Sequence, residues 1–146
     1  MSANEQREEH DIFPRDRQPT VRILAMPAHT NPNGNIFGGW IMAQMDVAGS
    51  VVAVEYAGGR VTTVAVTSME FHKPVFVGDL VSCFARITKV GSTSITVKVE
   101  VFVQRARDGQ LLADKVTEAV IVYVAISEDG KPRKLPERGP DFGRYW

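Results

Sequence analysis

The chain is short of cysteine and of any surplus of charge, and each shortage excludes a class of protein. Its 146 residues hold a single cysteine, Cys83, so no disulfide can form within the chain, as is typical of a reducing compartment. Lys plus Arg and Asp plus Glu both number 17, so nucleic acid is not expected as the main partner. This balance still leaves room for a local basic patch that binds one phosphorylated ligand.

The chain also lacks an uninterrupted membrane-spanning run. Residues 36–57 are long enough to cross a bilayer, but Gln44, Asp46 and Glu55 interrupt them. An aspartate at the centre of a spanning helix costs about 3 kcal/mol. The first residues contain acids and no apolar segment, unlike a secretory signal peptide. We therefore expect a cytoplasmic protein without membrane insertion, in which the apolar run is a buried helix.

Glycine, proline and asparagine dipeptides divide the rest of the chain into one helix and several strands. Gly38-Gly39 and Gly58-Gly59 bracket the apolar run, as at the two ends of a helix. In the segment 94–104, Ile and Val recur at every second position, as on the buried face of a strand. We expect strands, several of them joined by tight turns, over residues 20–26, 60–71, 80–90, 94–104 and 111–126.

This order of elements predicts an α+β fold, with an antiparallel sheet wrapped around one long central helix. The helix is apolar nearly all round, so we expect the curved sheet to cover it on most sides. Polar and proline-containing segments flank this domain. The expected division is a flexible arm over residues 1–19, the domain over 20–127 and a tail over 128–146. The two open edges of such a sheet could pair with those of another copy in a dimer.

The most unusual stretch is TNPNGNIFGG, residues 30–39, which stands directly before the apolar helix. It contains the pattern N-x-x-G-x-x-x-G-G, and an aspartate follows seven residues after the last glycine. Each element alone is weak evidence, but the ordered set is specific. Its members are Asn31, Gly34, Gly38, Gly39 and Asp46.

This set resembles the signature of the YciA-type acyl-CoA thioesterases of the hotdog-fold superfamily. The similarity continues through RVTTVAV, MEFHKPVFVGD and TEAVIVYVAISEDGKPRKLP, and so covers about residues 20–136. The resemblance implies a hotdog fold and the hydrolysis of acyl-CoA to a free acid and coenzyme A. It also implies dimers with active sites at the subunit interface, assembled as a trimer of dimers. We expect neither a metal nor a cofactor to be needed.

Thioester hydrolysis needs a base or nucleophile and a group that stabilises the oxyanion. Asp46 is the candidate for the first role, because a bare carboxylate is costly to bury. From the residues alone, a structural carboxylate is equally compatible, either paired with a buried Lys or Arg or hydrogen-bonded to the loop, and the resemblance favours catalysis. Whether Asp46 activates water or attacks the carbonyl stays open. The backbone N–H of Gly39, at the start of the helix, is the expected oxyanion donor, although paired glycines also simply begin helices.

Two further polar residues are candidates for the same site. Asn31 can orient the water or the thioester through its side chain, or it can form an Asx-turn before Pro32. Thr63, in RVTTVAV, is expected to supply a hydroxyl across the dimer, while its neighbour Thr62 faces the other side of the sheet. A threonine in a strand is more often only a strand former.

Coenzyme A carries phosphates, so basic groups and free backbone N–H groups should converge on it. Lys89 with the turn that contains Gly91, Thr93 and Ser94 is one candidate group. Arg133 and Lys134 form a second, and Gly34 and Gly38 of the motif are also assigned to substrate binding. Each charged residue among them is more often ordinary surface charge.

The histidines and the cysteine support other functions only weakly. His29 and His72 lack a third ligand at usable spacing, so a metal site is not expected. Cys83 is expected to be a small buried hydrophobe. Two rival functions remain: a non-catalytic acyl-CoA sensor on the same fold, and a hotdog dehydratase. The first would not need Asp46, and the second usually requires a catalytic histidine.

Overall fold

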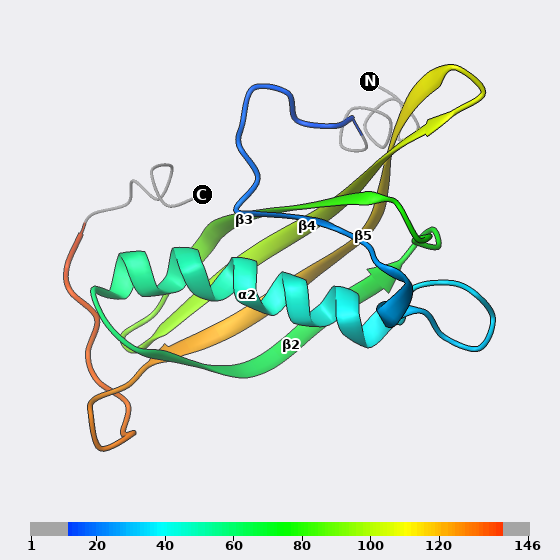
Figure 1. Cartoon of the computed structure of the whole chain (residues 1–146). Helices are drawn as coiled ribbons and strands as arrows, with labels where there is room; N and C mark the ends of the chain where they lie inside the picture. Colours follow the sequence, from blue (N-terminus) through cyan, green and yellow to red (C-terminus); the bar gives the residue numbers. More distant parts are fainter. Residues whose placement is uncertain (1–11, 139–146) are drawn as a thin grey trace.

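The computed structural model describes residues 12–138 and shows one long helix lying across one face of a five-stranded sheet (Figure 1). All strand pairs are antiparallel, and the order across the sheet is β1-β3-β4-β5-β2. The predicted α+β architecture is confirmed. The elements are β1 (Val21–Leu24), η1 (Pro27–His29), α2 (Gly38–Ala57), β2 (Val61–Phe71), β3 (Leu80–Val90), β4 (Ser94–Arg107) and β5 (Gln110–Ala125).

The glycines predicted to bracket α2 do stand at its ends. The helix begins at Gly38 and ends at the left-handed Gly58 (φ 66°), whose N–H bonds to the carbonyl of Val54. One face of the helix packs on the sheet through residues such as Ile41, Met45, Ala48 and Val52.

The other face of α2 is not covered in the single chain. Apolar side chains there are between 43 and 51% exposed: Val47, Val51 and Val54. The prediction that the sheet covers the helix on most sides is therefore wrong for one chain, because the sheet spans only one face of α2.

The sheet places β2 at one edge, beside β5 and not beside β3, its successor in the chain. β4 has the expected period of two, and its inward side chains from Ile95 to Val103 are buried. It runs on to Arg107, beyond the predicted end, because Asp108 and Gly109 (φ 51° and 75°) make a tight turn into β5. No helix in the described part of the chain is long and apolar enough to cross a membrane.

The segments on either side of the predicted domain pack against it. Of the predicted arm, residues 1–11 lie outside the described residues, but Phe13 contacts Phe84 and Phe102 edge-on, each at 5.6 Å between ring centroids. Of the predicted tail, residues 139–146 lie outside the described residues, whereas Leu135 is buried with the core. The division at residues 19 and 127 stays a prediction.

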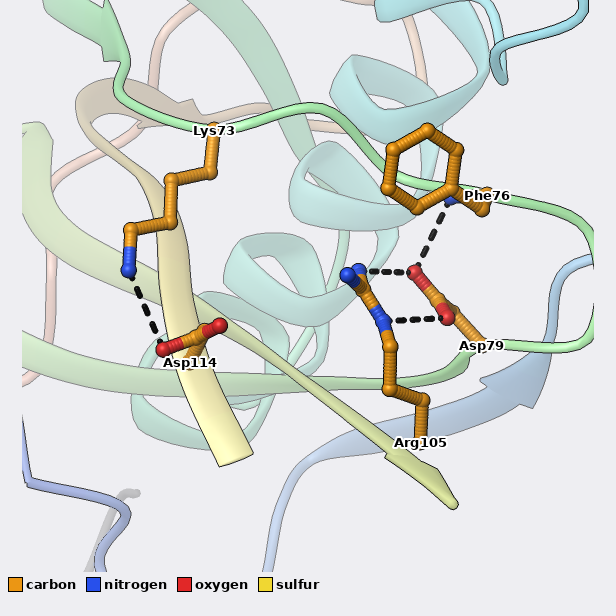
Figure 2. A network of polar contacts seen from close by, with 5 residues as sticks. All are labelled: Lys73, Phe76, Asp79, Arg105 and Asp114. Carbon is orange, nitrogen blue, oxygen red and sulfur yellow. Dashed lines mark hydrogen bonds and ion pairs between the residues drawn. The ribbon is translucent and has the colours of Figure 1, made fainter. Parts of the chain in front are cut away.

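An ion pair anchors the loop of residues 72–79, which joins β2 to β3 (Figure 2). The buried Asp79 accepts two hydrogen bonds from the guanidinium of Arg105, at 2.9 and 2.6 Å. Its carboxylate also accepts one from the N–H of Phe76 at 2.9 Å. The same loop holds the segment before α2, because the carbonyl of Val75 accepts the N–H of Ile36 at 2.9 Å.

Candidate active site

A pocket of about 230 Å³ opens between the first half of α2 and strands β2 and β5. Gly39 and Asp46 of α2 and Thr63 of β2 line it, so three of the four predicted catalytic residues share one pocket. Wider hollows of about 480 and 490 Å³ lie along residues 12–22, but several charged side chains line those. The rest of the lining at Asp46 is apolar and suits an acyl group: Met42, Ala43, Met45, Val66, Met69, Ala119 and Ile121.

Two hydroxyl groups hold one oxygen of the Asp46 carboxylate. Oδ1 accepts hydrogen bonds from Thr63 Oγ1 at 2.7 Å and from Tyr123 Oη at 3.0 Å. The Tyr123 hydroxyl also lies 3.0 Å from the backbone carbonyl of Asp46. It has one proton, and the ionised carboxylate is the stronger of its two acceptors. Among residues 12–138, no donor contacts the second oxygen, Oδ2.

The register of the sheet explains why these hydroxyls converge. Thr63 of β2 and Tyr123 of β5 are direct cross-strand partners, so their side chains stand on the same face, toward α2. A register shift between Thr63 and Ala65 follows at once and changes the twist of the edge strand. We expected Thr63 to act across the dimer; instead, its hydroxyl contacts Asp46 of the same chain, which corrects that expectation.

Sequence reasoning missed Tyr123 and the glycine that accommodates it. Tyr123 is fully buried, and this burial together with the nearby Asp46 carboxylate raises the pKa of its hydroxyl, which therefore stays a neutral donor. At Gly49, a Cβ atom would lie 2.2 Å from the Tyr123 hydroxyl oxygen. An isolated glycine inside an apolar helix, three residues after Asp46, was the available signal of such a close approach.

The two glycines at the start of α2 have different surroundings. Neither N–H has an acceptor among the described residues, as expected for the first turn of a helix. A Cβ at Gly39 would meet no atom within 4 Å, so this position is open to a ligand in the pocket. A Cβ at Gly38 would lie 3.3 Å from the ring of Phe71, and Gly38 does not line the pocket.

Asn31 is not brought to this pocket within one chain. Its Oδ1 accepts the N–H groups of Asn33 (2.9 Å) and Asn35 (3.1 Å), so the Asx-turn alternative does form. Gly34 occupies the left-handed region in the same exposed loop, with φ of 85°. No acceptor among residues 12–138 contacts the side-chain amide of Asn31, which leaves its N–H groups available to a ligand.

The residues predicted for coenzyme A gather only in part. Gly91 and Lys134 line a hollow of about 410 Å³ at the C-terminal end of α2, whereas Lys89 is exposed and Ser94 accepts the N–H of Gly91. The carbonyl of Thr93 is paired with the N–H of Ala125.

Arg133 already donates to the backbone, and its predicted contact with a phosphate stays a prediction. Its guanidinium donates to the carbonyls of Ala57 (3.0 Å) and Ile126 (3.2 Å) and so caps the C-terminal end of α2.

His29 and His72 lie away from the Asp46 pocket. His29 stacks on Trp40, with ring centroids 4.8 Å apart, and does not line the pocket as a dehydratase histidine would. His72 forms with Glu70 and Glu118 a group whose ligand atoms all lie within 4.8 Å of one another. Met69 and Ala119 line the pocket, so the adjoining Glu70 and Glu118 face the opposite side of the sheet. Cys83 is buried as expected, and burial raises its pKa to about 12.

Comparison with known proteins agrees with this geometry. Residues 33–109 match the model of the thioesterase superfamily. The acyl-CoA thioester hydrolase YciA of Salmonella typhimurium is 53% identical over 122 residues, which cover 82% of this chain and 90% of the relative. A hexameric hotdog-fold thioesterase of Campylobacter jejuni is 43% identical, with a TM-score of 0.80, over 84% of this chain and 93% of the other.

A more distant structure bears on the site itself. The acyl-CoA hydrolase of Staphylococcus aureus, solved with butyryl coenzyme A and coenzyme A, is 26% identical, with a TM-score of 0.73, over 86% of this chain and 75% of the other. Its solved variants include alanine replacements of one asparagine, one aspartate and one threonine. The aspartate follows the asparagine by 15 residues and precedes the threonine by 17. Asn31, Asp46 and Thr63 have the same spacing in this chain.

Proposed function

We propose a mechanism for this pocket from one premise: the chain belongs to the YciA-type acyl-CoA thioester hydrolases of the thioesterase superfamily. The reaction of this family is the hydrolysis of an acyl-CoA thioester to a free carboxylic acid and coenzyme A. The roles assigned below to individual residues are our proposal for this chain.

Asp46 acts through Oδ2, the oxygen without a donor among the described residues. The carboxylate takes a proton from water, and the water oxygen attacks the thioester carbonyl carbon. The resulting oxyanion points at the N–H of Gly39 and is stabilised by it and by the positive end of the α2 dipole. The C–S bond then breaks, and the coenzyme A thiolate recovers the proton from Asp46.

We assign water as the nucleophile and Asp46 as its general base. Gly39 and Asp46 are seven residues apart, close to two turns of α2, so both lie on the helix face that lines the pocket, and a thioester carbonyl can sit over that face. Attack by Asp46 itself, through an acyl-enzyme intermediate, is the alternative mechanism.

Asn31 enters the site from a second copy of the chain. Asn31 of the partner subunit would place its free amide N–H groups at the thioester or the water, because Asn31 does not line the Asp46 pocket of its own chain. The hexameric state of the Campylobacter jejuni relative supports a trimer of dimers here. The exposed apolar face of α2 and the open edge of β2 supply surfaces for such contacts. A single, buried cysteine supports action in the cytoplasm.

The observation that carries the proposal is the half-buried Asp46 carboxylate, held by two hydroxyls at the wall of an apolar pocket. The test is the release of free thiol from a panel of acyl-CoAs, with wild type beside Asp46→Ala. We expect wild type to release thiol and Asp46→Ala to lose about 10²–10⁴-fold in kcat with an unchanged melting temperature.

The outcomes of this assay separate the rival functions. Activity retained by Asp46→Ala would contradict the assigned mechanism. If wild type released no thiol from any acyl-CoA but still bound one, the sensor function would replace hydrolysis. Conversion of a hydroxyacyl-CoA to an enoyl product would instead indicate a dehydratase.

A further inference from the structure

We infer that Tyr123 is a positioning residue for Asp46, selecting which carboxylate oxygen acts, and that Gly49 is a glycine so that Tyr123 can do this. The inference rests on the proposed role of Asp46 as the base. Its first support is the asymmetry of the carboxylate, in which Oδ1 has two hydroxyl donors and Oδ2 has none among the described residues.

This asymmetry matters because the two oxygens of a free carboxylate are equivalent. The terminal torsion of an aspartate is soft and two-fold, so an unheld carboxylate could present either oxygen to the water. Two donors on Oδ1 occupy its acceptor positions and leave Oδ2 for the reacting water. The pair therefore fixes both the orientation of the group and the identity of the working atom.

Of the two donors, Tyr123 is the rigid one. Its side chain is fully buried in the sheet, on β5 between Thr63 of β2 and Ile95 of β4. Thr63 lies on the edge strand and is exposed in the single chain, so fewer neighbouring atoms restrain its hydroxyl group. The Tyr123 hydroxyl also lies 3.0 Å from the backbone carbonyl of Asp46, and its ring packs against Gly49, so close contacts with α2 hold it in place.

Gly49 gives the tyrosine ring its space. A Cβ at this position would lie 2.2 Å from the hydroxyl oxygen and 3.0 Å from ring carbons Cε2 and Cζ of Tyr123. Glycine inside a helix costs stability relative to alanine, and this close approach is the reason to keep it. An alanine here would push the hydroxyl away from Asp46 unless the helix moved off the sheet.

The test compares Tyr123→Phe with wild type in steady-state kinetics. The ring stays and only the hydroxyl leaves, so we expect kcat to fall about 10- to 100-fold, the cost of one hydrogen bond to a charged group, with KM little changed. Thr117→Val is the matched control, because it removes another fully buried hydroxyl from β5, one bonded to the carbonyl of Glu70. We expect it to lower the melting temperature but leave kcat unchanged.

Gly49→Ala tests the same contact from the helix side. It should lower both kcat and the melting temperature, and its effect on the melting temperature should shrink in the Tyr123→Phe background, where the closest clash is gone. An unchanged kcat in Tyr123→Phe, with melting lowered as in Thr117→Val, would show a purely structural hydroxyl and overturn the inference. The Asp46→Ala assay separates this result from failure of the proposed function. If Asp46→Ala is inactive and Tyr123→Phe is fully active, only the positioning role of Tyr123 is contradicted.

Discussion

At the scale of single residues, α2 uses glycine twice near the pocket for different physical reasons. Gly49 admits the ring of Tyr123, while Gly39 borders open space in which the substrate is proposed to bind. Substitution should therefore act on different quantities at the two positions. At Gly49 it destabilises the fold and disturbs the site together, and at Gly39 it disturbs the site without destabilising the fold.

Gly39→Ala should raise stability and lower activity. The added methyl meets no atom of the chain within 4 Å, and alanine is favoured over glycine by at most about 1 kcal/mol, the value for a helix interior, since Gly39 lies in the first turn of α2. The same methyl occupies the approach to the proposed oxyanion donor, so kcat/KM should fall at least about tenfold, the loss that a misplaced hydrogen bond brings. Denaturant unfolding and thiol release on one preparation measure both. An unchanged kcat/KM would remove Gly39 from the oxyanion site.

At the level of residues, the sequence pointed to Asp46 and Gly39, which the structure brings into one pocket; their catalytic roles stay predictions. Asp46 is conspicuous in an apolar run, and the motif around it supplied Gly39 and Asn31. Tyr123 could not be found in this way, because an aromatic residue in a strand is ordinary. The contact of Tyr123 with Asp46 depends on the pairing of Tyr123 with Thr63, which is 60 residues away in the chain. A single sequence does not show this strand register.

At the scale of elements, the boundaries were predictable to within a few residues, and the pairing partners of the strands were not. Glycine and proline dipeptides mark where α2 and the strands stop, because few other residues adopt those backbone angles. No local sequence pattern shows that β2 pairs with β5 at the edge of the sheet and not with β3, the next strand in the chain. The connecting loop of residues 72–79 is consequently a crossover, and it depends on its own anchor, Asp79.

Loss of that anchor should cost much more than loss of the exposed pair beside it in Figure 2. Asp79→Ala leaves the guanidinium of Arg105 and the N–H of Phe76 without their acceptor, and should destabilise the fold by about 3–5 kcal/mol. Asp114→Ala breaks only the solvent-exposed bond to Lys73 and should cost about 0–1 kcal/mol. Urea unfolding compares the two variants.

Hydrogen exchange adds a spatial readout to the same comparison. Asp79→Ala should accelerate exchange in residues 72–79 and in the segment that the loop holds through Val75 and Ile36. Equal stabilities for the two variants would show that the buried ion pair does not anchor this crossover.

At the scale of the whole molecule, the single chain leaves surfaces that a second copy would cover. Three apolar side chains of α2 (Val47, Val51 and Val54) and the edge strand β2, with Val64 at 53% exposed, form such surfaces. The sequence predicted this need from the open sheet edges, but it gave no means of telling which edge carries the active site. The proposed site lies at the β2 edge, where Thr63 lines the pocket.

Subunit mixing tests whether a site takes residues from two chains. Asp46→Ala and Asn31→Ala, each inactive alone, are co-expressed with different affinity tags and purified through both. If Asn31 serves the pocket of the partner subunit, each mixed dimer contains one pocket with both side chains intact, and thiol release returns. Doubly tagged protein without activity would place the two residues in the same subunit's site.

The unpaired edge of β2 also affects how activity scales with the amount of protein. If Asn31 and Asp46 meet only after two chains associate, working sites form by mass action, and a dissociated chain contributes none. Near the dissociation constant, doubling the chain concentration would then more than double the number of sites. Specific activity would fall on dilution of the enzyme, and in a cell a modest change in gene dosage would be amplified in the rate at which acyl-CoA is consumed.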